Sequence, residues 1–345
     1  MSSCSNDLIG VNHRNQFADS LRGIAAVLVV VGHLLIRDAS SFDKQSTFLS
    51  FIYCVHMPVF FFFAGFFAHN AFEKNGKSFV REKSLRLLVP YAAWSCVAVG
   101  AKAILNIVNG CWKFSEFIND IWMTLLSAES VWFFLALFWM QMLFYVLNRI
   151  SPKKHVLPGV LVAVVIYLLP LPNTLALHHM QEMIPSFALG ILVARNEWMK
   201  KVQCSKAAMI MSILVVLTSP LYVCFVYAHR LAYGISFVVS GILELMVAIS
   251  VGTLGGFILR KVDFIGKHFG VLGKYSMEIY CIHMFFVKYI PLTVPKSIIR
   301  IPIIAEASYC ILGGMIAWLC VFLSWAILNR VPLYRKLMLG RWKRK

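Results

Sequence analysis

An apolar stretch near the N-terminus carries three ionisable side chains whose spacing places them on one side of a helix. The run FADSLRGIAAVLVVVGHLLI, residues 17 to 36, contains Asp19, Arg22 and His33. A helix turns about 100° per residue, so Arg22 and His33 lie about 20° apart around the axis, and Asp19 lies about 60° from Arg22. A charged group at membrane depth costs at least about 2.5 to 3.5 kcal/mol. This stripe must therefore face protein or water rather than lipid.

The chemistry that this stripe offers is proton transfer. His33 is the best candidate for a general base, because a neutral imidazole can accept a proton from a hydroxyl group. Asp19 is expected to be a structural partner of Arg22, with proton transfer as its second possible role. His56 lies two residues before Pro58, where a proline can open a helix and free backbone carbonyls. His56 belongs either to a kinked packing helix or to a substrate-binding site.

A second polar face is predicted near residue 280. Ser276, Tyr280 and His283 are spaced by four and three residues, so they share one face of a helix. This face either hydrogen-bonds a polar substrate or ties its helix to the neighbouring helices. Glu244 lies in the middle of another apolar run, where a carboxylate is protonated or paired, so it is an acid or one half of a structural pair. Three histidines at membrane depth, together with Arg22, favour a functional site over packing alone.

Two arginines lie beside the membrane after the second apolar run. Arg81 and Arg86 belong to the sequence REKSLRLLVPY, which contains Pro90. The positive charge of cytoplasmic loops explains them without any ligand. Alternatively, they bind the phosphates of a cytosolic donor, because arginine offers bidentate geometry to phosphate oxygens. Trp132 opens a further apolar run and belongs either to the interfacial aromatic belt or to a substrate-binding site.

The elements that must position these residues are membrane helices. The chain has 345 residues, of which 60% are hydrophobic and 14% charged, and a mean hydropathy of +0.75, outside the range of soluble globular proteins. We expect an all-α polytopic bundle with a cytoplasmic segment at 1–16, a transmembrane domain at 17–328 and a basic cytoplasmic tail at 329–345. With about 20 apolar residues needed to cross a bilayer, ten spans are predicted, at 17–36, 47–68, 85–108, 131–149, 156–171, 182–195, 207–228, 234–258, 272–292 and 303–328.

Basic residues are distributed unevenly between the loops. With the N-terminus in the cytoplasm, the inner segments hold 23 Lys and Arg residues and the outer segments hold 7. Ten spans with both ends inside are therefore favoured. The basic charge is spread over every inner loop, which argues against nucleic-acid binding. The final residues WKRK, from Trp342, are expected to be a solvated anchor at the membrane surface.

The sequence shows no sign of a metal site. The nine cysteines contain no CxxC pair and lie mostly inside apolar runs, so neither a zinc site nor a disulfide framework is predicted. The first apolar run carries no small-residue cleavage site, so it is expected to be retained as a span. Histidines in the outer loops, such as His178 and His179, are expected to be solvated, and Glu278 is expected to reach the membrane surface from a span end.

Taken together, these stretches resemble the acyltransferase 3 family of integral membrane O-acyltransferases. The ten residues between Arg22 and His33 match the family's Arg-ten-His signature, which implies His33 as the catalytic histidine and Arg22 as its essential partner. The resembling pieces are, in chain order, DSLRGIA, HMPVFFFFAGF from His56, REKSLRLLVPY from Arg81, WFFL from Trp132 and LGKYSMEIYCIH, which ends at His283.

The resemblance also implies a donor and an acceptor. The expected donor is cytosolic acyl-CoA, most simply acetyl-CoA, and the expected acceptor is a hydroxyl of a cell-surface or lipid-linked glycan at the outer face of the bacterial cytoplasmic membrane. Arg81 and Arg86 are implied as functional residues. The chain ends about 15 residues after its last predicted span, so it is expected to be a stand-alone form without an appended soluble domain.

Two mechanisms and one rival function stay open. His33 either deprotonates the acceptor hydroxyl for direct attack or carries the acyl group transiently. Arg22 lies eleven residues away, or about 16 Å along a straight helix, a separation that fits an extended donor. A transporter or flippase of a lipid-linked glycan would also suit ten spans with buried charge, although no internal repeat is present. A purely structural membrane protein leaves the charged stripe unexplained.

Overall fold

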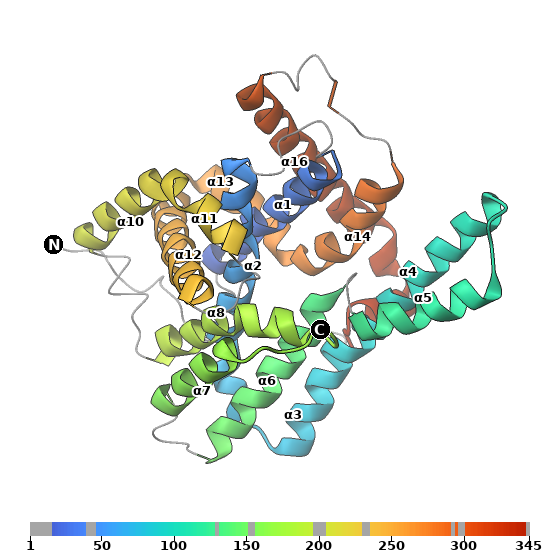
Figure 1. Ribbon diagram of the computed structural model, residues 1–345, viewed down its shortest axis with the longest axis horizontal. Coiled ribbons are helices and arrows are strands. Elements are labelled where there is room, and N and C mark those ends of the chain that lie inside the picture. The colour runs from blue at the N-terminus through green and yellow to red at the C-terminus, as the bar shows by residue number, and fades with distance from the viewer. Residues whose placement is uncertain are drawn as a thin grey trace. The chain divides into compact units, whose positions relative to one another are not determined.

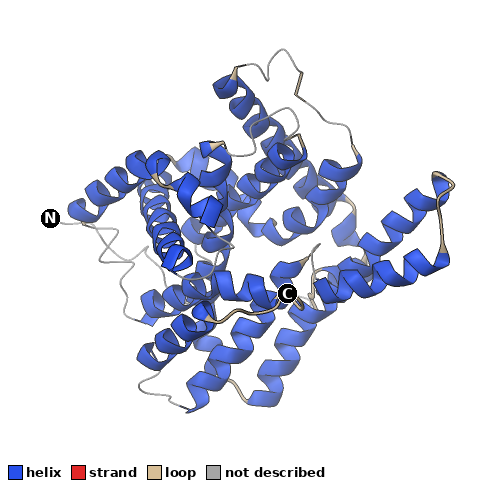
Figure 2. Ribbon diagram, in the orientation of Figure 1, coloured by secondary structure: helices blue, strands red, loops and turns tan. Residues whose placement is uncertain are grey.

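The computed structural model describes residues 16–38, 46–127, 131–150, 156–195, 205–229, 235–290, 294–295 and 301–342. Within these ranges the chain is helical and has no strand, as Figure 2 shows. The predicted all-α class is confirmed. Among these described residues, six helices are long and apolar enough to cross a membrane, or seven if one bent helix pair counts as a single span. The count of ten spans and the cytoplasmic position of both ends stay predictions.

The chain divides into two compact units. The first contains Met1–Phe67 and Leu189–Ser324, and the second contains Ala68–Ala188 and Trp325–Lys345. The predicted division at residues 17 and 328 stays a prediction. The boundaries between the units fall inside three helices, which are α2 (Thr47–Ala68), α8 (Leu177–Arg195) and α16 (Pro302–Ala326).

The first unit is organised around α1 (Gln16–Arg37), which is shown in blue in Figure 1. Its neighbours on the described chain include α12 (Ile235–Lys261), α13 (Asp263–Lys274) and α14 (Ser276–Tyr289). Helix α1 therefore packs against protein along its length. The charged stripe of this helix can therefore face protein. Exposing these charged groups to lipid would cost free energy.

Two glycines allow the backbones of α1 and α13 to touch. A Cβ atom on Gly23 would lie 2.0 Å from the carbonyl oxygen of Phe269. A Cβ atom on Gly273 would lie 1.7 Å from the carbonyl oxygen of Asp19. Small residues at a helix contact permit this close approach. The same contact holds the backbone of Asp19 in place.

The second unit contains helices from the middle of the chain. They are α3 (Gly76–Lys83), α4 (Val89–Val108), α5 (Phe114–Ser127), α6 (Trp132–Ile150) and α7 (Val156–Leu168). A π-helical turn, η2 (Ser84–Leu88), joins α3 to α4, so that one helical run extends over Gly76–Val108. A second π-helical turn, η5 (Tyr334–Met338), belongs to the C-terminal segment.

Three expected features differ in the structure. Helix α5 occupies a stretch that was expected to be an outer loop. The predicted span at 207–228 is two helices, α10 (Lys206–Thr218) and α11 (Val223–His229), bent by 63° around a turn that contains Pro220. The predicted span at 272–292 is broken at Tyr275, whose backbone (φ −105°, ψ 15°) leaves the helical region between α13 and α14. Spans predicted from the length of apolar runs do not show such breaks in a helix.

Candidate active site

Helices α1 and α14 bring two of the predicted histidines together. The ring centroids of His33 and His283 lie 5.3 Å apart, and the ring planes are inclined by 36°. His33 is half-buried, whereas His283 is 1% exposed. The first unit therefore places a partly accessible imidazole beside a buried one, although the two residues are 250 positions apart in the sequence.

The tautomer of His283 follows from its backbone contact. Its Nδ1 lies 2.8 Å from the carbonyl oxygen of Ile279. A carbonyl only accepts hydrogen bonds, so Nδ1–H donates, and Nε2 of the neutral ring carries the lone pair. Nε2 is buried and has no hydrogen-bond partner among the described residues. Because buried polar atoms are nearly always satisfied, this nitrogen lacks the hydrogen-bond partner that such an atom usually has.

His56 has the same kind of backbone contact on α2. Its Nδ1 lies 2.6 Å from the carbonyl oxygen of Ile52, and its ring centroid lies 4.8 Å from that of Tyr53, with the two planes nearly perpendicular. The side chain is 5% exposed. Helix α2 continues through Pro58, so the opening of the helix that a proline allows does not break it here.

The three histidines expected at membrane depth gather in one region of the first unit. His33 and His56 both lie within electrostatic range of His283. A Cβ atom on Gly32 would touch Tyr53 at 3.4 Å, which places α2 beside α1 next to His33. Each of these histidines is predicted separately from the sequence, and the fold brings them together.

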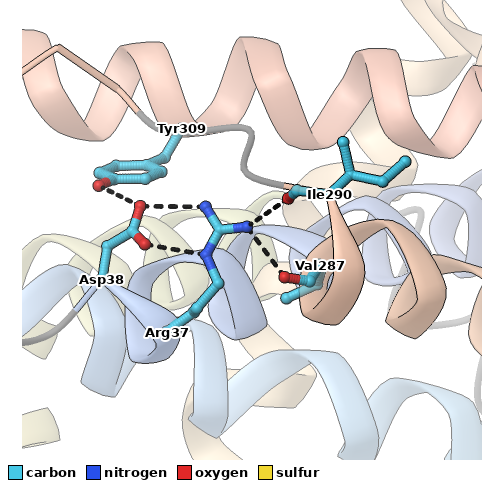
Figure 3. Close-up of polar contacts among 5 residues, drawn as sticks. All are labelled: Arg37, Asp38, Val287, Ile290 and Tyr309. Atoms are coloured by element: carbon cyan, nitrogen blue, oxygen red, sulfur yellow. Dashed lines mark hydrogen bonds and ion pairs between the residues drawn. The ribbon is translucent and has the colours of Figure 1, made fainter. Parts of the chain in front are cut away.

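A network of polar contacts fixes the end of α1, as Figure 3 shows. Arg37 donates from Nε to one oxygen of Asp38 at 2.8 Å and from Nη2 to the other at 3.2 Å. Its Nη1 donates to the carbonyls of Val287 at 2.9 Å and Ile290 at 3.4 Å. The hydroxyl of Tyr309, on α16, donates to Asp38 at 3.0 Å. This network joins the C-terminal ends of α1 and α14 to the side of α16.

The network lies one helical turn from the histidine pair. Arg37 follows His33 by four residues on α1, and Val287 follows His283 by four residues on α14. Residues four apart share a helix face, so the bond between Arg37 and Val287 holds the two helices together beside the two rings. Arg37 directly follows the predicted span at 17–36 and is one of the seven basic residues assigned to the outer segments. Its spacing from His33 is the signal that could have identified it.

The predicted pair of Asp19 and Arg22 is confirmed. Arg22 Nη1 lies 3.3 Å from Asp19 Oδ1, and the arginine side chain is 34% exposed against 6% for the aspartate. The aspartate is therefore buried, whereas the arginine side chain is partly exposed. A catalytic role for either residue stays a prediction.

Of the other candidates in the first unit, Ser276 and Glu244 are buried and Tyr280 is half-buried. Ser276 begins α14 and is 8% exposed, and the ring of Tyr280 lies 6.4 Å from that of His283. Glu244 is 8% exposed on α12. The structure differs at Glu278, which was expected to reach the membrane surface and is fully buried. Its position in the first turn of α14 favours a carboxylate, because the helix dipole is positive there.

Arg81 and Arg86 are both exposed and belong to the second unit. Glu82 contacts Lys74 at 2.7 Å and Arg86 at 3.4 Å, while the Arg86 side chain is 64% exposed. Lys83 Nζ lies 5.3 Å from the centre of the Phe79 ring. The basic surface around η2 thus presents guanidinium groups that an anion can reach.

Trp132 is stacked on a histidine. Its ring lies 4.3 Å from that of His179, with 28° between the planes, and His179 Nδ1 lies 3.3 Å from Glu182. His178, expected to be solvated, is 8% exposed and lies 3.9 Å from the same carboxylate. His178 is buried because this stretch begins α8 instead of forming a loop. No group of three or more metal-ligating side chains is found in the part of the chain that the structure describes.

Residues 15–328 match the family model described as an acyltransferase domain, and the chain belongs to this family, acyltransferase 3. A nodulation protein NolL of Sinorhizobium fredii is 30% identical over 207 residues, which are 56% of this chain and 52% of that protein. A nodulation protein NolL of Mesorhizobium japonicum is 34% identical over 91 residues, 25% of this chain and 24% of that protein. The chain thus spans about half the length of the first relative and a quarter of the second. No solved structure matches it.

Proposed function

We propose that this protein is a membrane O-acyltransferase that moves an acetyl group from cytosolic acetyl-CoA to a hydroxyl of a cell-surface or lipid-linked glycan. The proposed location is the bacterial cytoplasmic membrane, with the protein embedded as a multi-pass chain. The observation that carries this proposal is the pairing of His33 with His283 in a member of an acyltransferase family.

In the proposed reaction, the hydroxyl oxygen of the acceptor attacks the carbonyl carbon of the thioester. The carbon–sulfur bond breaks, an ester forms, and coenzyme A leaves. His33 accepts the hydroxyl proton as the new bond forms and returns it to the departing sulfur, so that the thiol is released. His283 supports this step by accepting a hydrogen bond from a glycan hydroxyl at Nε2, which its bond to Ile279 leaves as an acceptor.

The donor is proposed to bind through its phosphates. Arg81 and Arg86 are exposed and lie on either side of Glu82, and guanidinium groups bind phosphate oxygens in bidentate geometry. Arg22 lies about 16 Å from His33 along α1, and its partner Asp19 lies about 21 Å from His33. An extended coenzyme A thioester fits a path of this length.

Thioester consumption distinguishes this proposal from a flippase. The purified protein in liposomes, supplied with acetyl-CoA and a glycan acceptor, is expected to release free thiol, and the His33→Ala variant is expected to release it only at the background rate. His268→Ala is the control, because His268 is an exposed histidine whose Nδ1 bonds the carbonyl four residues earlier, as Nδ1 of His283 does. Movement of glycan across the bilayer without thiol release would contradict the proposal.

A further inference from the structure

One backbone carbonyl in the helix that carries Arg86 lacks its regular donor within the helix. In the π-helical turn η2, the N–H of Val89 donates to the carbonyl of Ser84, five residues earlier. The next residue, Pro90, has no N–H to donate. In this register its missing bond would have reached the carbonyl of Leu85. The helix therefore leaves the Leu85 carbonyl without its regular partner, directly beside Arg86.

The C-terminal segment supplies that partner. The indole N–H of Trp342 donates to the Leu85 carbonyl at 3.2 Å. In the opposite direction, the indole N–H of Trp94 on α4 donates to the carbonyl of Met338 at 3.0 Å. Each segment thus gives one indole donor to a carbonyl of the other. All four residues belong to the second unit.

Gly340 sits at the closest point of this contact. Its φ is +60°, and a Cβ atom there would lie 2.7 Å from both Arg86 Cα and the Leu85 carbonyl oxygen. Glycine permits both the left-handed conformation and the close approach. Trp342, the first residue of the expected anchor, is 42% exposed, and its bond to Leu85 tethers the end of the described tail to η2. Residues 343–345 of the predicted anchor lie outside the described residues.

We infer that Tyr334–Trp342 is a positioning clamp that holds the backbone of Arg86 in the orientation needed to bind the phosphates of the acyl donor. This inference rests on the proposed function. A π-helical turn contains one residue more than an α-helical turn. If η2 relaxed to α-helical geometry, the side chains before it would rotate by about 100° relative to α4. The bond from Trp342 to Leu85 stabilises the π-helical turn against that change.

Two glycines with a similar positive φ provide a matched test. Gly340→Ala adds a methyl group against η2, whereas Gly110→Ala adds one in open space at a φ of +68°. In the full-length protein, Gly340→Ala is expected to raise the KM for acetyl-CoA about tenfold with little change in kcat. It should also speed hydrogen exchange in peptides covering residues 84–94. Gly110→Ala is expected to change neither.

A second pair of variants tests the hydrogen bond itself. Trp342→Phe keeps an aromatic ring but removes the N–H, and Trp325→Phe is its control at an indole that is 63% exposed. Trp342→Phe is expected to raise the KM for acetyl-CoA severalfold and to speed the same exchange, whereas Trp325→Phe leaves both unchanged. Unchanged KM values in both Gly340→Ala and Trp342→Phe would overturn the inference, even if exchange became faster.

A third variant distinguishes whether the clamp hypothesis or the donor-site hypothesis is wrong. Arg86→Gln removes the phosphate-binding group without touching the clamp. If Arg86→Gln raises the KM for acetyl-CoA but the two clamp variants do not, the tail has no positioning role. If Arg86→Gln leaves the KM for acetyl-CoA unchanged, Arg86 does not bind the donor as the proposed function states. The tail then has no donor-binding residue to position.

Discussion

At the scale of single residues, the fixed tautomer of His283 makes a specific prediction. His283→Phe keeps a ring of similar shape but removes the buried acceptor Nε2. Loss of one hydrogen bond in the transition state is expected to lower kcat by about 10- to 100-fold while the KM for acetyl-CoA is unchanged. Steady-state thiol release measures both constants. His268→Phe, at an exposed position, is the control, and wild-type kcat in His283→Phe would remove His283 from the site.

How far the sequence predicted the site depends on the distance between its residues. Asp19 and Arg22 are three residues apart, so helix geometry alone predicted their contact. His33 and His283 are 250 residues apart, and no local rule relates them. The contribution of Asp38 and Tyr309 was missed for the same reason, since their hydrogen bond joins α1 to α16. The burial of Glu278 depends on where α14 begins, which apolar length does not define.

At the scale of elements, the contact between α1 and α13 depends on glycines. Gly23→Ala would place a methyl group against the Phe269 carbonyl, and such overpacking is expected to lower the free energy of unfolding by about 1 to 3 kcal/mol. Gly314→Ala is the matched control on α16, because nothing lies within 4 Å of its added Cβ. It should raise stability by about 0.5 to 1 kcal/mol. Thermal unfolding in detergent measures both, and equal effects would contradict the packing described.

The network at the end of α1 makes a second prediction at this scale. Tyr309→Phe removes the hydroxyl that donates to Asp38 and is expected to lower the free energy of unfolding by about 1 to 3 kcal/mol. Tyr289→Phe, at a side chain that is 37% exposed, serves as the comparison and should have little effect. A Tyr309→Phe protein as stable as the wild type would show that this bond does not hold α16 to α1.

The prediction of elements succeeded where helices are long and apolar. The predicted span at 47–68 has the bounds of α2, and the one at 303–328 differs from α16 by one or two residues at each end. Prediction failed for α5, because an amphipathic helix of 14 residues falls below the length used to recognise spans. It also failed at Pro220, where the bend depends on local backbone geometry.

At the scale of the whole molecule, the predicted topology can be tested with a native cysteine. Cys111 is exposed between α4 and α5, in a stretch that ten spans with cytoplasmic ends would place outside. In a variant whose other cysteines are replaced by serine, a membrane-impermeant maleimide added to intact cells is expected to label Cys111. Labelling only after the cells are permeabilised would contradict this topology.

The central claim for the whole molecule is that His33 supports transfer of an acyl group to a glycan. The most direct measurement is the transfer of radiolabelled acetyl from acetyl-CoA to the glycan fraction by membranes that contain equal amounts of wild-type protein or His33→Ala. Loss of a general base is expected to reduce transfer by about 10²- to 10⁴-fold, while His268→Ala keeps the wild-type rate. Wild-type transfer by His33→Ala would contradict the account.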